Sequence, residues 1–186
     1  MKMKLLLAGL LIVLLNTGSS CINDGIVVAV NLPISHTWNV NSGTNTNFSG
    51  SSTPIVLANQ IDGSYKDKVK GARYYDIRVS VGGTYSGNVS GTAYINGIPL
   101  LTFNGSWTDF KTPQSLLGSS THVTPQTAGV AALVSALNNF TSNSSTTVTL
   151  SANGNLTQSP VPAGLTVTVE IFAQIDAQVN GGDSSN

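Results

Sequence analysis

The most restrictive feature of this chain is a long alternation of apolar and polar residues near its C-terminus. Every second residue is apolar from Leu165 through Val167, Val169, Ile171, Ala173, Ile175 and Ala177 to Val179. Successive side chains of a β-strand point to opposite faces, so this period of two predicts a strand with one buried face and one wet face. At about 3.3 Å per residue the strand would run roughly 50 Å, and we therefore expect a bend or β-bulge within it.

Shorter segments repeat the same pattern. Residues 74–81 place Tyr75 on an apolar face and Asp76 on a polar one, and residues 88–95 and 146–152 also alternate. Between residues 88–95 and 98–103 the pair Asn96-Gly97 predicts a two-residue hairpin turn.

Two further segments surround these strands. Residues 26–30 and 34–40 indicate strand on either side of a break at Pro33. The polar residues 41–53 indicate a flexible loop without a site. Strands that alternate in this way predict antiparallel sheets with one solvent-facing side each.

One helix is expected, over residues 125–139. Thr124 suits the N-cap and Pro125 the first helical position. An apolar stripe follows at helical spacing, formed by Val130, Leu133, Val134 and Leu137. Together these patterns predict a mainly β fold for residues 26–180, a two-layer antiparallel β-sandwich with one packed α-helix.

The N-terminus indicates export. Lys2 and Lys4 precede an apolar run over residues 5–15, and small or polar residues follow. This three-part pattern is typical of a signal peptide, here residues 1–20, and the run is too short to span a bilayer permanently. Residues 21–25 would then be a short tether and residues 181–186 a disordered tail.

The residues before Cys21, the only cysteine, resemble the lipobox of bacterial lipoproteins. Gly18, Ser19 and Ser20 lead into it, although Leu, Val or Ile is commoner where Gly18 stands. The resemblance implies that Cys21 is diacylated and anchors the protein on a cell-envelope membrane. The alternative is ordinary cleavage that leaves an unpaired thiol.

Charge and motifs exclude several functions. Only 9% of residues are charged, and without residues 1–20 the chain has six basic and eight acidic side chains, a charge of −2. No nucleic-acid surface is expected from so few charges, and Lys66 to Arg73 is interpreted as a solvated face. The sequence contains no zinc-ligand spacing or calcium loop, so no metal and no cofactor are predicted.

Residues 124–134 resemble the helix that follows the catalytic serine in subtilisin-like proteases. Aligning Pro125 with the family proline places Thr121 where the nucleophile belongs, and the other two family motifs are missing from this sequence. A capped helix of small residues accounts for the likeness, and we do not predict a protease.

No catalytic residue is predicted. His36 and His122 are interpreted as structural or surface histidines, because no partner that would orient either as a base is identifiable. Glu170 and Asp176 share the outer face of the last strand about 20 Å apart, whereas glycoside hydrolysis needs two acids within about 5–9 Å. An acid from a neighbouring strand, such as Asp76 or Asp109, would be required.

Aromatic residues on the polar sides of strands are the candidate ligand or partner contacts: Trp38, Tyr74, Tyr94 and Phe172, with Trp107 near a loop. Flat aromatic rings on a wet face stack on sugars or fill a partner's pocket. The alternative is a second core layer, covered by the helix.

Two functions remain. The first is a non-catalytic, membrane-anchored envelope lipoprotein with a structural role or a role in binding a polysaccharide, lipid or protein partner. The second is an exported hydrolase acting on envelope or extracellular polysaccharide. Convergence of Glu170, Asp109 and a histidine in one cleft would favour the hydrolase.

Overall fold

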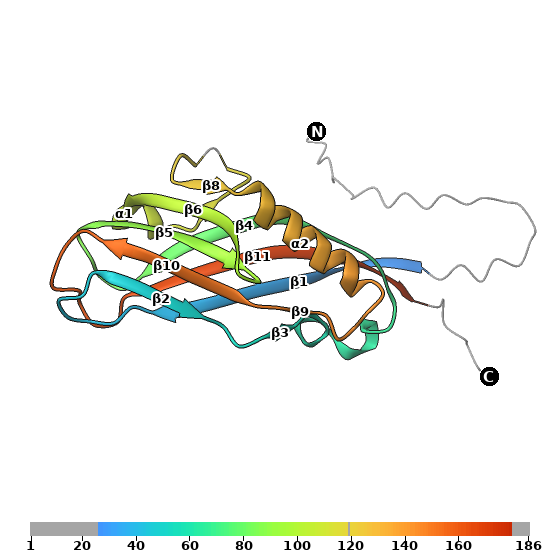
Figure 1. Ribbon diagram of the computed structural model, residues 1–186. Coiled ribbons are helices and arrows are strands. Elements are labelled where there is room, and N and C mark those ends of the chain that lie inside the picture. Colours follow the sequence, from blue (N-terminus) through green and yellow to red (C-terminus); the bar gives the residue numbers. More distant parts are fainter. Residues whose placement is uncertain (1–25, 119, 180–186) are drawn as a thin grey trace, which may run out of the picture.

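The computed structural model describes residues 26–118 and 120–179, and it is mainly β. Two antiparallel sheets pack together with one main helix beside them (Figure 1). This confirms the predicted β-sandwich. The predicted signal peptide, Cys21 with its tether, and the tail at 181–186 lie outside the described residues.

The first sheet has the strand order β1-β11-β4-β7. Its strands are β1 (Ile26–Asn39), β4 (Val69–Gly82), β7 (Gln114–Ser115) and β11 (Thr166–Val179). The central strand β11 is the alternating segment of the sequence, and all its inward-facing residues from Val167 to Ala177 are buried. The predicted strand and its buried face are confirmed.

The expected irregularity lies in the neighbouring strand rather than in β11. β11 pairs with β1 along its whole length without a shift. Its register with β4 shifts twice, because Tyr75 and Lys70 of β4 each lack a partner. The bulge at Tyr75 reverses the side-chain alternation, so Tyr74 packs against the core and Tyr75 is exposed.

The break expected at Pro33 does not occur. β1 is an edge strand, and it continues through Pro33, which lies opposite Phe172. An edge strand has one row of backbone groups with no partner in the sheet, so the missing amide proton of a proline is tolerated there. Because the strand is continuous, Trp38 shares the inward face with Leu32 and Ile34.

The second sheet has the order β2-β10-β5-β6-β8. Its strands are β2 (Asn47–Ser51), β5 (Asn88–Ile95), β6 (Ile98–Ser106), β8 (Val123–Pro125) and β10 (Leu150–Leu156). β5 and β6 form the predicted hairpin, in which the two turn residues have φ angles of 51° and 78°. That confirms the turn predicted from Asn-Gly.

The prediction of an unstructured loop over residues 41–53 is wrong, because β2 lies within it. β2 pairs only with β10 and is therefore an edge strand. Four of its five residues are Asn, Ser or Gly, and only Phe48 is buried. An edge strand with one large apolar residue leaves too little periodicity in the sequence to detect.

Small elements fill the remaining chain. A two-stranded ribbon pairs β3 (Ile55–Val56) with β9 (Thr147–Val148). Two 3₁₀ helices follow β3, η1 (Leu57–Gln60) and η2 (Gly63–Tyr65), and one turn of helix, α1 (Trp107–Phe110), follows β6.

The main helix, α2 (Thr127–Phe140), starts later than predicted. Thr124 and Pro125 belong to β8, where they pair with Thr102 and Leu101, and the N-cap is Gln126. The buried stripe also differs from the prediction: it comprises Gly129, Leu133, Ala136, Leu137 and Phe140. Val134 is 40% exposed and Val130 is half-buried, so the stripe is rotated toward Ala136.

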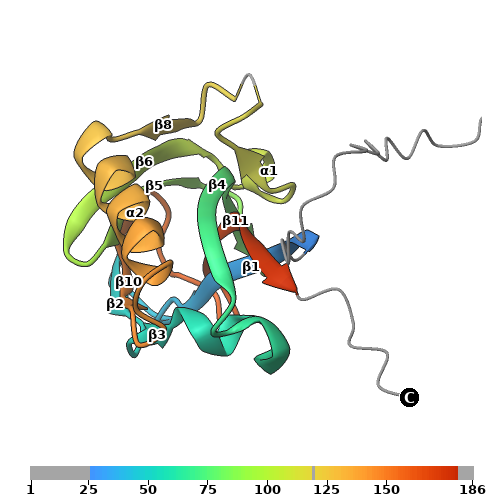
Figure 2. The ribbon, with the colours of Figure 1, turned by 90° about the vertical axis from the view of Figure 1, so that its right-hand side faces the viewer.

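α2 closes one side of the sandwich. It contacts β4 of the first sheet and β6 of the second (Figure 2). The Cβ of any other residue at Gly129 would overlap Leu100 of β6, so glycine allows the helix to approach that strand closely. The helix therefore packs at the edges of both sheets, and the expectation that it covers an aromatic outer face is wrong.

The sandwich has two different ends. β1 and β4 begin, and β11 finishes, at the end near Ile26 (Figure 1). The connections over residues 40–46, 83–87 and 157–165 lie at the opposite end, which we call the loop end. With 14 residues, β1 separates the two ends by about 43 Å.

Candidate functional site

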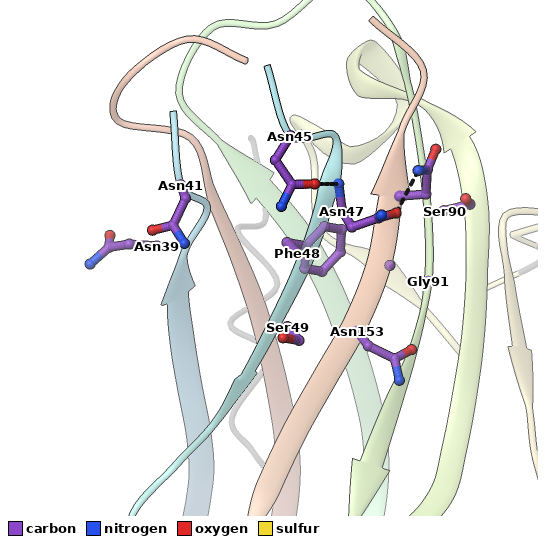
Figure 3. Close-up of a pocket in the computed structure, with 11 residues that line it drawn as sticks. Asn39, Asn41, Asn45, Asn47, Phe48, Ser49, Ser90, Gly91 and Asn153 are labelled. Atoms are coloured by element: carbon purple, nitrogen blue, oxygen red, sulfur yellow. Dashed lines mark hydrogen bonds between the residues drawn. The ribbon is translucent and has the colours of Figure 1, made fainter. Parts of the chain in front are cut away.

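A groove of about 580 Å³ opens at the loop end (Figure 3). Amide side chains dominate its lining: Asn39, Asn41, Asn45, Asn47, Asn153 and Asn155. Phe48, Ser49, Ser90, Gly91 and Gly154 complete it. We call this the asparagine groove.

Sheet register explains how distant residues meet there. Asn155 of β10 lies directly opposite Asn47 of β2 on one side and Ser90 of β5 on the other. Two residues back, Asn153 lies opposite Ser49. Residues two apart on a strand point to the same face, so these side chains stand together on the outer face of the second sheet.

Glycine shapes the strand between those two rows. Gly154 lies opposite Phe48 of β2, and any Cβ there would overlap the Phe48 ring and the Ser90 carbonyl oxygen. The buried Phe48 ring thus packs directly on the Gly154 backbone. The groove is therefore lined by the backbone of Gly154, with amide side chains on either side of it.

Hydrogen bonds hold several of these amides in place. Asn155 Nδ2 donates to Asn47 Oδ1 at 2.8 Å and to Thr46 Oγ1 at 3.3 Å. The backbone N–H of Asn47 donates to Asn45 Oδ1 at 3.0 Å (Figure 3). These contacts orient the groove before any ligand arrives, which lowers the entropic cost of binding.

The lining defines the chemistry of a ligand. Every polar side chain in it is an amide or a hydroxyl, which together donate and accept hydrogen bonds, and no residue of the lining is ionisable. Such a surface complements a neutral molecule rich in hydroxyl groups. It offers neither a charge for binding phosphate nor an acid or base for catalysis.

Tyr94 is the predicted aromatic contact that lies beside the groove. It is half-buried on the outer face of β5, and its Oη accepts a hydrogen bond of 3.0 Å from Asn153 Nδ2. The outer position predicted from alternation is correct for this residue.

Three other predicted contacts point elsewhere. Trp38 is 6% exposed between the sheets, where it packs against Gly50, because it lies an even number of residues from the buried Leu32 and Ile34 of the same strand. Tyr74 packs against the core because of the bulge at Tyr75. Trp107 is 8% exposed as the first residue of α1 and carries the Lys111 ammonium 4.3 Å above its ring.

Phe172 does lie on an outer face, but on the other sheet. It is half-buried on β11, and the guanidinium carbon of Arg78 lies 4.5 Å from its ring centroid. The exposed Tyr75 ring is 6.1 Å away, centroid to centroid. The predicted aromatic residues therefore do not form a single surface.

Asp109 and His122 approach each other, with 3.8 Å between Oδ2 and Nδ1. Asp109 Oδ2 accepts hydrogen bonds from the Ser106 hydroxyl at 2.7 Å and from the Ser106 backbone N–H at 2.8 Å, and the backbone bond is part of a capping box at the start of α1. These bonds hold the pKa of Asp109 below its ordinary value. A carboxylate so stabilised in its ionised form is a poor general acid, and its capping role accounts for its position.

The other candidate acids are on the first sheet. Glu170 lies in β11 opposite Ser35 and Arg78, and Asp176 pairs with Arg73 at 2.7 Å. His36 packs edge-on against Trp38. Glu170 thus lies opposite residues of β1 and β4, whereas Asp109 and His122 approach each other.

Asp76 is a polar residue whose burial the alternation did not predict. It was expected on a wet face, yet it is only 3% exposed. Arg78 Nε donates to its Oδ2 at 2.6 Å and Ser115 Oγ to its Oδ1 at 2.7 Å. Burial raises the pKa of Asp76, but the bonds from Ser115 and Arg78 outweigh it, and the pKa lies below its ordinary value.

The sequence patterns do not predict the asparagine groove. Asn45 with Asn47, and Asn153 with Asn155, stand two residues apart, which is the spacing of one strand face. That spacing was the available signal, but the general abundance of Asn and Ser obscured it.

Within residues 26–118 and 120–179, no three His, Cys, Asp or Glu side chains gather in a way that could hold a metal ion. Over the same ranges, none of the helices has the length and apolar character needed to cross a membrane.

The sequence matches no protein-family model and no curated protein. Several solved chains are similar, among them two viral chains with low scores. A chain of Desmodium yellow mottle tymovirus is 12% identical with a TM-score of 0.35, over 99% of this chain and all (100%) of that one. A chain of turnip yellow mosaic virus is 11% identical with a TM-score of 0.39, over 86% and 100%. Similarity at this level carries no inference about function.

Proposed function

We propose that this protein is an exported envelope lipoprotein, anchored through Cys21, whose β-sandwich binds a neutral polysaccharide in the asparagine groove without catalysis. The single observation that carries the binding role is the lining: six asparagine side chains and no ionisable group. Saccharide hydroxyls donate and accept hydrogen bonds as amides do, so the two surfaces are complementary.

The position of the groove is consistent with an anchored protein. The described chain begins at Ile26, a few residues after Cys21, and the groove lies at the opposite end of β1. An anchor on Cys21 would therefore leave the groove facing away from the membrane, within reach of a polymer in the surrounding space.

The test uses the chain from residue 21 onward with Cys21→Ser, so that no lipid interferes. Binding is measured calorimetrically to three neutral polysaccharides (a glucan, a mannan and a galactan) and to anionic polygalacturonate. We expect binding to at least one neutral polymer. We expect Asn153→Ala and Asn155→Ala each to weaken it about fivefold to tenfold, the effect of losing one hydrogen bond.

Asn138→Ala is the matched control, because Asn138 is an exposed asparagine on α2 rather than in the groove. An equal loss of affinity in Asn138→Ala, or preference for the anionic polymer, would contradict the proposal. The same mixtures are assayed for new reducing ends. Their release by the protein would favour the exported hydrolase instead.

A further inference from the structure

Two large aliphatic side chains are exposed where the described chain begins. Ile26 is 63% exposed and Val27 is 60% exposed, although both belong to a strand. Ile26 pairs with Val179, the last residue of β11. This end of the first sheet therefore presents aliphatic groups directly to its surroundings.

Lysine side chains lie at the same end. The backbone N–H of Gln178 donates to the Lys68 carbonyl at 2.8 Å, so Lys68 is adjacent to the strand end that Ile26 borders. Lys70 follows at the start of β4, where both lysines are exposed, and Lys66 precedes them at the end of η2. Three of the four lysines after residue 20 thus gather at this end.

The tether limits how far this end can stand from an anchor. Five residue steps join Cys21 to Ile26, and even fully extended they span only about 17 Å. Resting on the proposed acylation of Cys21, this length keeps Ile26 within one tether of the bilayer surface.

We propose that the end of the sandwich formed by Ile26, Val27 and the lysines Lys66, Lys68 and Lys70 is a membrane-contact surface. The aliphatic side chains enter the interfacial region, and the ammonium groups lie against anionic headgroups, as in other peripheral membrane surfaces. Seating this end on the bilayer holds β1 upright and presents the asparagine groove outward.

The occupant follows from the tether and from the charges. A lipid leaflet is the surface that the anchor brings within reach, and it accepts aliphatic side chains and lysines together. The exposed acids Asp62 and Asp67 lie in the same segment, where the three lysines outnumber them.

The first experiment needs no acylation. The Cys21→Ser chain, from residue 21, is mixed with vesicles of equal parts phosphatidylcholine and phosphatidylglycerol, and with vesicles of phosphatidylcholine alone, and binding is measured by co-sedimentation. We expect binding to the anionic vesicles that high salt weakens. The double variant Ile26→Ser, Val27→Ser should reduce it about tenfold or more, since two aliphatic groups no longer leave water.

Leu117→Ser is the matched control, because Leu117 is 72% exposed but lies just after β7. It should bind vesicles like the parent. No vesicle binding by the parent, an equal loss in Leu117→Ser, or self-association that depends on Ile26 and Val27 in place of vesicle binding would each overturn the proposal.

The second experiment uses the full chain in native membranes. An amine-reactive reagent should label Lys66, Lys68 and Lys70 less than Lys111, which follows α1 and serves as the internal reference. Fatty-acid labelling of Cys21 is scored separately in the same preparation. Labelled Cys21 with fully reactive lysines would overturn the contact surface while leaving the anchor intact.

Discussion

Asp76 carries a carboxylate that β4 and β7 enclose. Both of its oxygens accept hydrogen bonds, one from Arg78 and one from Ser115. Because Arg78 also lies over the Phe172 ring, the carboxylate fixes the guanidinium that covers this part of the outer sheet face. Through its bond to Ser115, Asp76 joins the short strand β7 to the first sheet.

We expect Asp76→Asn to lower the free energy of unfolding by about 1–3 kcal/mol near pH 7, because the bonds from Arg78 and Ser115 lose a charged acceptor. Folding lowers the pKa of Asp76. Its stabilising contribution is therefore complete above the unfolded pKa of about 3.9, and is lost as the pH falls through that value toward the folded pKa.

Denaturant midpoints between pH 7 and pH 2 measure this effect. On acidification, the free energy of unfolding should fall more in the parent than in Asp76→Asn. Asp67→Asn, at an exposed turn, is the control and should change the free energy by less than about 0.5 kcal/mol. Identical acid limbs in parent and Asp76→Asn would show that Asp76 does not carry the linkage.

Among the elements, α2 covers the side of the sandwich that the short edge strands leave open. β7 has two residues and β8 three, so neither covers the side of the sandwich between β4 and β6. Leu133, Leu137 and Phe140 of α2 are at most 2% exposed and belong to the core cluster. The helix therefore completes the core from the side.

Neighbouring residues of α2 provide a test of this role. Leu133→Ala should cost about 2–5 kcal/mol, the range for buried leucines, because it leaves a cavity between the sheets. Val134→Ala, one position along and 40% exposed, should change the free energy of unfolding by less than about 0.5 kcal/mol. Denaturant midpoints of the two variants decide the matter: similar values would mean that α2 is not part of the core.

At the scale of the whole molecule, the two ends of the sandwich have different chemistry. Exposed aliphatic residues and lysines occupy the end where the described chain starts, and neutral amides occupy the loop end. Their separation is the length of β1, about 43 Å. This difference between the two ends is consistent with a protein that is anchored at one end and binds a ligand at the other.

The anchor itself is tested in cells. We expect Cys21→Ser to move the protein from the membrane fraction to the soluble fraction, and to abolish incorporation of a labelled fatty acid, because the only cysteine is the only thiol that can be acylated. Fractionation after labelling measures both. Retained label in Cys21→Ser, or an unlabelled parent, would end the lipoprotein hypothesis.

Features that depend on local backbone geometry could be predicted from the sequence. Alternation identified β11 and its buried face, and Asn96-Gly97 identified the β5–β6 turn, because strand period and turn conformation involve only adjacent residues. From these followed the antiparallel sandwich.

Features that depend on pairing between distant segments could not be predicted from the sequence. The bulge that turns Tyr75 outward is a property of the β4–β11 register, and Asp76 is buried because β7 binds it from 39 residues away. The asparagine groove likewise needs β2, β5 and β10 side by side. The alternation within one segment does not specify the register in which that segment pairs with its neighbours. The positions of these side chains are therefore fixed only when the strands pair.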